Sequence, residues 1–298
     1  MRAYLLLCLG LVALILSGCG EEKRAGADSA SPSPALWLIE KGGHKGWLFG
    51  TVHMLPQGLV WETPAITKAI ERADMLVLEA AGLENETRNA AIFEKLGRTT
   101  GLPDIAERVP SARRPALAAL MEKNSFTNGT LTPYESWAAA LLLSSGLQKD
   151  LKLKTGGGVE SQLEPRFLKK GKPIIGLETV EGQLGIFDSL PEAAQRQFLT
   201  QVVEEADSAD NTYKIMVTAW LSGDVERLSH QFMAEFGNTP ALVRPLLTNR
   251  NKSWARQVEA LMRRPGTPLI AVGTGHLVGR DSLQALLVKR GFRVRRVE

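Results

Sequence analysis

The sequence predicts an α/β fold: a mixed β-sheet flanked by helices, with a helix-rich insertion between about residues 87 and 155. Two features of the chain support this fold class. Short apolar runs typical of strands recur along it, and most of them are separated by stretches whose apolar residues are spaced near 3.6. Strands that alternate with helices indicate a sheet with helices packed on its faces.

The first expected elements are a hairpin, a helix and a strand. Apolar runs at 36–40 and 46–50 flank a glycine-containing turn, which predicts a β-hairpin with His44 exposed in the turn. Residues 64–73 have a helical pattern. Residues 74–79 are an apolar run that ends in a carboxylate, and they predict a buried strand.

The middle of the chain is expected to be rich in helices. Spacing near 3.6 predicts helices at 87–96, 111–123 and 133–147, the last of which follows a Thr-Pro start signal. These three form the expected insertion. A triple glycine at 156–158 predicts a turn before a further helix at 161–170.

The C-terminal half is expected to return to the sheet. Residues 172–178 predict a strand that again ends in a carboxylate, and helical patterns then dominate 191–264, with breaks near 222–223 and 237–240. The last expected elements are a strand at 268–273, a helix at 281–290 and a strand at 292–297. Residues 35–298 have a length suited to a single α/β domain with an insertion.

The segment before residue 35 is expected to lie outside this domain. Residues 1–18 predict a signal peptide, because Arg2 precedes an apolar stretch, 5–16, that is short for a membrane span. Leu-Ser-Gly before Cys19 resembles the lipobox of bacterial lipoproteins and implies that Cys19 is acylated, for example with palmitate. An ordinary cleaved signal is the alternative. Residues 19–34 have the composition of a tether.

Residue 20, the net charge and the cysteine content indicate where the protein is located and which partners and metal ligands to expect. Gly20 is not the aspartate associated with inner-membrane retention, so we expect a lipid-anchored envelope protein, on the outer membrane and facing the periplasm if the host is Gram-negative. A formal charge of +4 is too small to indicate nucleic acid. The chain has two cysteines, and Cys8 would leave with the signal. Any metal would therefore need imidazole and carboxylate ligands.

Two phrases of the form Gly-x-x-His follow apolar runs and end at His53 and His276. The chain has four histidines, so half of them occur in this context. Glu79 and Glu178 also stand at the ends of expected strands, where sites form in open α/β sheets. Two imidazoles with one or two carboxylates form a possible ligand set for Zn, Mn, Fe or Co. Such an ion would support hydrolysis by lowering the pKa of a bound water.

Each of these residues also has a structural interpretation. The two histidines of the phrases could be buried imidazoles satisfied by backbone carbonyls. Glu79 could form a buried salt bridge with Arg250. Glu160 could belong to the first turn of the next helix, where a carboxylate suits the helix dipole, and Glu178 could stand at a helix start in the same way. His230 is expected to lie on the surface or to fill the core.

A set of short motifs runs through the whole predicted domain. They are Phe49-Gly50-Thr51-Val52-His53-Met54 with Pro56, Leu76-Val77-Leu78-Glu79, Gly158-Val159-Glu160, Gly176-Leu177-Glu178-Thr179 with Glu181 and Gln183, Arg250-Asn251 with Trp254, and Gly273-Thr274-Gly275-His276-Leu277 with Gly279. Together they resemble the TraB/PrgY/GumN family, whose animal relatives are the Tiki proteins. The resemblance implies a fold similar to the erythromycin-esterase/ChaN-like group.

The resemblance also implies a chemistry. For the Tiki branch it implies a metal-dependent peptidase that relies on residues matching His53, His276 and Glu79. Arg250 and Asn251 match the Arg-Asn pair of the family. The resemblance implies that this pair holds a substrate carbonyl or the oxyanion of a tetrahedral intermediate.

The resulting hypothesis is a lipid-anchored, metal-dependent hydrolase that acts on peptide bonds of a peptide or protein substrate. Glu160 or Glu178 would serve as general base or would support the metal ligands. One alternative is a binding protein that uses the same cleft without turnover, as a haem or iron carrier or as a partner-binding factor of the envelope. Another is an inactive relative whose helical insertion contacts a partner. The sequence leaves the substrate, the ion and the oligomeric state open.

Overall fold

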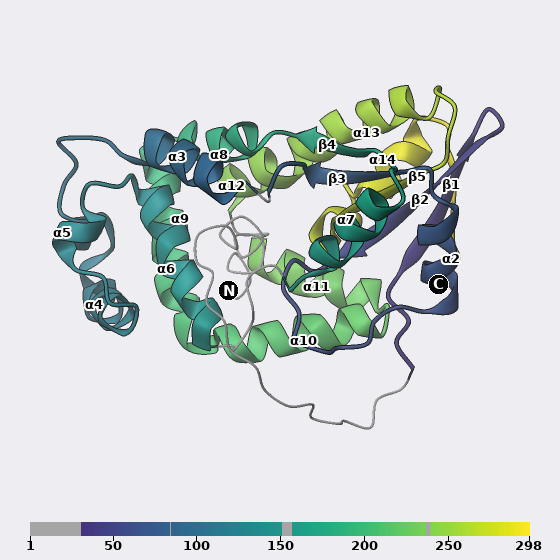
Figure 1. The fold of residues 1–298 in the computed structure, drawn as a ribbon. Helices are drawn as coiled ribbons and strands as arrows, with labels where there is room; N and C mark the ends of the chain where they lie inside the picture. Colours follow the sequence, from purple (N-terminus) through teal and green to yellow (C-terminus); the bar gives the residue numbers. More distant parts are fainter. Residues whose placement is uncertain (1–30, 84, 151–156, 237–238) are drawn as a thin grey trace.

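The computed structural model describes residues 31–298 except 84, 151–156 and 237–238. At its centre is a six-stranded sheet with the strand order β4-β3-β5-β2-β1-β6 (Figure 1). The strands are β1 (Leu36–Lys41), β2 (His44–Thr51), β3 (Met75–Ala80), β4 (Ile174–Glu178), β5 (Pro268–Gly273) and β6 (Arg293–Arg296). A mixed sheet with flanking helices confirms the predicted α/β class, while the erythromycin-esterase/ChaN-like fold stays a prediction.

Four neighbouring strands of the sheet are parallel. β2 pairs with β5, β5 with β3 and β3 with β4 in this sense, whereas β1 pairs antiparallel with both β2 and β6. The predicted hairpin is confirmed, and its turn uses Gly42 and Gly43 at φ 57° and 84°. His44 is not in the turn as predicted. It begins β2 opposite Lys41 and is half-buried, because two glycines suffice for the turn.

Helices cover both faces of the sheet (Figure 1). Along β3, successive side chains enter different cores, because side chains alternate across a strand. Val77 packs in the core that contains residues of α13 and α14, whereas Leu76 and Leu78 pack in the core that contains residues of α2, α7 and α10. These helices are α2 (Pro64–Arg72), α7 (Val159–Lys169), α10 (Ala209–Leu221), α13 (Asn249–Leu261) and α14 (Leu283–Lys289).

A third core belongs to a group of helices beside the sheet (Figure 1). Its helices include α3 (Glu86–Gly97), α4 (Arg114–Lys123), α6 (Ser136–Asp150), α8 (Val180–Asp188), α9 (Glu192–Glu205), α11 (Val225–Phe236) and α12 (Pro240–Val243), with the short α5 (Asn128–Leu131) next to α4. Helices α3 to α6 occupy the range predicted for the insertion. The helix predicted at 111–123 begins only at Arg114, after a 3-10 turn.

Helix α8 begins just after Glu178, where the sequence offered a helix start only as an alternative interpretation. It contains Gly182 and Gly185, and glycine is a weak helix former, which hides the helical pattern. The Thr179 side chain accepts a hydrogen bond from the N–H of Gly182 and so caps the first turn. This cap follows Glu178 directly, so the first turn of α8 holds the end of β4 in place.

The features predicted for the N-terminal segment fall largely outside the described residues. The predicted signal peptide, 1–18, and Cys19 lie there, as does the tether up to residue 30. Within the described part, the N–H of Ser33 donates to the carbonyl of Leu221. In the same part of the chain, no helix combines the length and apolar character that a membrane span requires.

Candidate functional site

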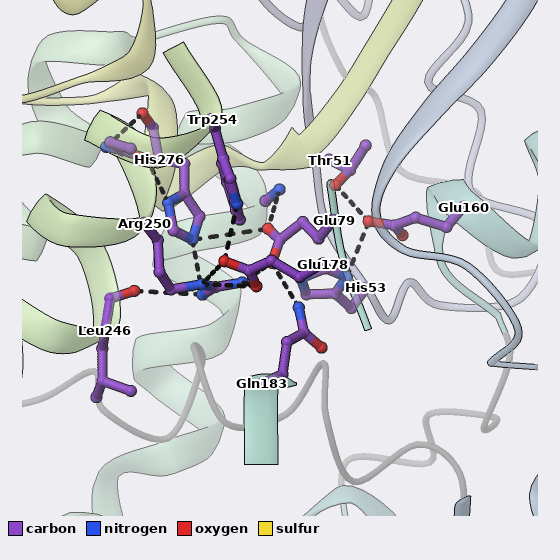
Figure 2. A network of polar contacts seen from close by, with 12 residues as sticks. Thr51, His53, Glu79, Glu160, Glu178, Gln183, Leu246, Arg250, Trp254 and His276 are labelled. Atoms are coloured by element: carbon purple, nitrogen blue, oxygen red, sulfur yellow. Dashed lines mark hydrogen bonds and ion pairs between the residues drawn. The ribbon is translucent and has the colours of Figure 1, made fainter. Parts of the chain in front are cut away.

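Four polar side chains lie where neighbouring parallel strands end (Figure 2). His53 follows β2, Glu79 lies near the end of β3, Glu178 ends β4, and His276 lies in a 3-10 turn, Thr274–Leu277, after β5. Because these strands are adjacent and parallel, their carboxyl ends meet at one edge of the sheet. The structure thus brings together side chains that the sequence places at separate strand ends.

Arg250, in the first turn of α13, pairs with two of the carboxylates. Its Nη2 lies 2.6 Å from Glu79 Oε2 and 2.9 Å from Glu178 Oε2, and its Nε lies 3.1 Å from both oxygens of Glu178. Burial alone would lower the pKa of Arg250, but the charges of Glu79 and Glu178 raise it. The structure therefore contains the salt bridge between Glu79 and Arg250 that the sequence offered as an alternative.

His276 is contacted at both ring nitrogens. Its Nδ1 lies 2.7 Å from Asn251 Oδ1, and its Nε2 lies 3.1 Å from Arg250 Nη1. Because a guanidinium only donates, Nε2 accepts and Nδ1–H donates to Asn251. Burial lowers the pKa of His276 to about 3, which keeps the imidazole neutral at pH 7.

The side-chain amide of Asn251 forms its hydrogen bonds with other groups of the protein. Besides contacting Nδ1 of His276, it donates from Nδ2 to the carbonyls of His276 at 3.2 Å and Asp281 at 2.8 Å. The residue is buried. The structure thus places Asn251 where it orients His276, and contact with a substrate stays a prediction.

His53 is held by Glu160 from the first turn of α7. His53 Nδ1 lies 2.8 Å from Glu160 Oε1, and the same oxygen accepts the hydroxyl of Thr51. Burial alone would lower the pKa of His53, but the charge and hydrogen bond of Glu160 outweigh it and raise the pKa to about 9. Gly158 allows this approach, because a Cβ there would lie 2.0 Å from the carbonyl oxygen of His53. Glu160 therefore sits at a helix start and also contacts a site histidine.

Glu79 lies between these groups. Its Oε1 accepts the N–H of Gly273 at 2.8 Å and lies 3.7 Å from His276 Nε2, while Gln183 Nε2 lies 3.4 Å from Oε2. Burial alone would raise the pKa of Glu79. The neighbouring His276 and the cationic Arg250 more than offset this effect and lower the pKa to about 2. Glu79 is therefore ionised at neutral pH.

Two of the predicted metal ligands, His53 and Glu79, lie beside Gly273. A Cβ added to Gly273 would lie 2.9 Å from Glu79 Oε1 and 3.2 Å from His53 Nε2, so these two donor atoms flank the space beside the glycine. Both histidines also have Nδ1 held by a side-chain oxygen, which is the usual support of a metal-binding imidazole. The donor types are therefore those that bind divalent ions, and the Nδ1 contacts hold both imidazoles in place.

The same geometry shows what an ion would displace. In the described part of the chain, no group of three or more His, Cys, Asp or Glu side chains is arranged to hold a metal ion. Arg250 Nη1 lies against His276 Nε2, so this nitrogen becomes available only when the guanidinium moves. His53, Glu79 and His276 stay predicted ligands.

Three contacting residues were not singled out for this role from the sequence. Thr51 holds Glu160, and Gln183 contacts Glu79. Trp254 is fully buried, and its indole N–H donates to Glu178 at 2.8 Å. Thr51 and Gln183 occur in the quoted motifs, and a polar side chain inside such a motif is the signal that points to them.

The other two histidines lie outside this site. His230 is exposed on α11, in agreement with the surface interpretation. His44 begins β2, at the end of the strand away from His53. Both therefore serve as control positions for substitutions at the site.

Thr51→Val is expected to lower the free energy of unfolding by about 1–3 kcal/mol, because it removes a buried hydrogen bond to the charged Glu160 and keeps the side-chain shape. Thr51→Ser keeps the hydroxyl and should recover most of this loss. Urea unfolding at pH 7 measures both. Equal costs for valine and serine would show that the methyl group of Thr51 contributes, and the hydrogen bond does not.

The two site histidines should give stability a maximum near pH 6.5. Between about pH 3 and 6.5 the unfolded chain protonates His276 and the folded protein does not, so stability falls as the pH falls. Between about pH 6.5 and 9 the folded protein keeps a proton on His53 that the unfolded chain releases, so stability falls as the pH rises. Each limb should change by up to roughly 1 kcal/mol per pH unit.

Urea unfolding at pH 5, 6.5 and 8.5 tests these limbs. His276→Gln should flatten the acidic limb and His53→Gln the alkaline one. His230→Gln, as the control, should leave both unchanged. An alkaline limb that persists in His53→Gln would contradict the assignment.

Comparison with known proteins gives this site a family. The model of the TraB/PrgY/gumN family matches residues 35–296. Similar proteins include "Uncharacterized protein YbaP" of Escherichia coli (strain K12), which is 23% identical over 266 residues, 85% of this chain and 96% of the relative. A protein of the same name from Shigella flexneri is also 23% identical, and the match covers 85% of this chain and 92% of the relative.

A protein of a third organism is also similar to this chain. An uncharacterized protein of Treponema pallidum (strain Nichols) is 23% identical over 304 residues, 97% of this chain and 91% of the relative. No solved structure matches. Because the family model covers nearly all of the domain that holds the site, the chain belongs to the TraB/PrgY/gumN family.

Proposed function

We propose that this protein is a metal-dependent hydrolase of the cell envelope that cleaves peptide bonds. One observation supports it above the others: His276 Nε2 lies 3.7 Å from Glu79, His53 Nε2 and Glu79 border the same space beside Gly273, and the Nδ1 of each histidine is held by a second side chain. That arrangement is typical of metal-binding imidazoles. Peptide bonds as the substrate class follow from the likeness to the Tiki branch.

The residues have distinct roles in this proposal. His53, His276 and Glu79 hold the ion, which when bound polarises a carbonyl and lowers the pKa of a water. Glu160 orients His53 and is the candidate general base. Asn251 orients His276. Arg250 supplies N–H donors to the developing oxyanion of a tetrahedral intermediate.

Glu178 takes a different role from a general base. Three of its contacts are donors that compensate its charge: Arg250 Nε, Arg250 Nη2 and Trp254 Nε1. These contacts give Glu178 the role of positioning Arg250, which leaves Glu160, the carboxylate that contacts His53, as the candidate for the base.

The test combines metal analysis with cleavage of a peptide library. Wild-type protein loaded with Mn²⁺, Co²⁺, Zn²⁺ or Fe²⁺ should retain metal through gel filtration and cleave peptides only when loaded. His53→Gln, Glu79→Gln and His276→Gln should each lose most of the bound metal and at least about a hundredfold in rate. His230→Gln should match the wild type.

Two results would contradict parts of this proposal. Absence of bound metal under every loading condition would end the metal assignment. Metal retention without cleavage would favour the alternative of a binding protein, which a haem titration of the same variants then examines through a Soret shift.

The envelope location belongs to the same proposal. Acylation of Cys19 would anchor the chain to the membrane, and residues 20–34 would separate the lipid from β1. Radiolabelled palmitate should be incorporated into the wild-type chain and not into Cys19→Ser. Incorporation into that variant would rule out Cys19 as the lipidated residue.

A further inference from the structure

Arg250 occupies contacts that the proposed ion needs (Figure 2). Its Nη1 lies 3.1 Å from His276 Nε2, and its Nη2 lies 2.6 Å from Glu79 Oε2. The Nε2 atom of a neutral imidazole has a single lone pair in the ring plane, so it can accept from Arg250 or bind an ion, but not both. A divalent ion and this guanidinium therefore compete for His276.

Arg250 also has contacts that leave the proposed ligands untouched. Its Nε lies 3.1 Å from both oxygens of Glu178, and its guanidinium lies 4.6 Å from the centre of the Trp254 ring. The indole N–H of Trp254 donates to the same carboxylate. If the guanidinium left Glu79 and His276, Glu178 would therefore still compensate its charge.

The backbone before Arg250 is irregular. Residues Arg244–Thr248 form a π-helical turn between α12 and α13, and such turns occur frequently at functional sites. The carbonyl of Leu246, inside this turn, accepts a hydrogen bond from Arg250 Nη1 at 3.2 Å. The nitrogen that faces His276 is thus also bonded to the irregular turn.

We propose that Arg250 is an internal competitor for the ion: it closes the site by bonding to Glu79 and His276, and it withdraws onto Glu178 when a divalent ion binds. This inference rests on the proposed function. It gives Glu178 a defined purpose as the group that receives the arginine. It also makes Arg250 a positioning residue in the metal-free protein, before any contact with a substrate.

Calorimetric titration with Co²⁺ and with Mn²⁺ tests the exchange on four purified proteins: wild type, Arg250→Met, Glu178→Gln and the double variant. Removing the competitor should tighten metal binding at least tenfold. Glu178→Gln should weaken binding about tenfold when Arg250 is present, because the arginine loses its alternative partner. In the Arg250→Met background the same change should alter affinity less than twofold.

The double-mutant comparison separates exchange from a simple effect of charge. If Arg250 and Glu178 acted only through their fields, their effects would be additive within about twofold, and the inference would be overturned. Weaker binding in Arg250→Met would overturn it as well. Arg263→Met, at an arginine of which the side chain is 77% exposed, should bind like the wild type.

The outcomes for the two proposals are distinct. If none of the four proteins binds either ion, the proposed function fails. If all bind with additive effects, only the exchange fails. Where circular dichroism shows that Arg250→Met does not fold, Arg250→Lys replaces it, because one ammonium group cannot reproduce the forked contacts with both carboxylates and His276. That variant should bind the ions at least threefold more tightly than the wild type, and equal or weaker binding would overturn the exchange.

Discussion

Arg250→Met is expected to lower the free energy of unfolding by about 3–5 kcal/mol, because it leaves Glu79 and Glu178 as buried carboxylates without their cation. Methionine keeps most of the side-chain length, so the loss reports charge more than packing. Both carboxylates lie close to the substituted side chain and are poorly exposed. Urea unfolding at pH 7 measures the effect.

Two controls make this expectation specific. Arg263→Met, which removes an exposed arginine just beyond the same helix, should change stability by less than about 0.5 kcal/mol. Combining Arg250→Met with Glu79→Gln and Glu178→Gln should recover much of the lost stability, because the neutral amides carry no charge that a cation would have to compensate. Similar costs for the two arginine variants would mean that solvent already compensates the two carboxylates.

The sheet was largely predictable because its strands carry strong local signals. The buried runs of β3 and β5 are continuous apolar segments, as strands covered on both faces usually are. Helix α8 lacks such a signal, since its two glycines weaken the pattern and its cap, Thr179, directly follows a strand. The order of the strands also stayed open, because pairing joins β3 to β5 across almost two hundred residues.

The site was predictable only at the level of which strand ends carry polar groups. His53, Glu79, Glu178 and His276 could be placed at one edge because parallel strands end together. The sequence raised the pair of Glu79 and Arg250 as an alternative, but the contacts of Arg250 with Glu178 and His276 could not be predicted. Arg250 comes from a helix that is distant in sequence, and its choice between Glu79, Glu178 and His276 depends on the packing of α13 against the sheet.

Gly273→Ala is expected to remove metal binding while the fold persists. The added methyl group would lie 2.9 Å from Glu79 Oε1 and 3.2 Å from His53 Nε2, so it would fill the space between two proposed donors. The closest of these atoms is the end of a side chain that can shift, so the cost to stability should be only about 1–2 kcal/mol. The affinity for Co²⁺ should fall by roughly a hundredfold, the upper end of losses seen when metal-ligand support is disturbed. Calorimetry and urea unfolding measure the two effects.

Gly50→Ala is the matched control, because Gly50 is the corresponding glycine of the other Gly-x-x-His phrase. Its three closest atoms would all belong to Thr274, the nearest at 3.0 Å, rather than to a proposed ligand. Its cost should therefore appear in stability and leave the Co²⁺ affinity within about threefold of the wild type. Equal losses of affinity in both variants would mean that the two glycines serve the turn off the strand. A loss confined to Gly273→Ala would mean that the two phrases differ in purpose: the first glycine lets β2 pack against the turn after β5, and the second makes room for the ion.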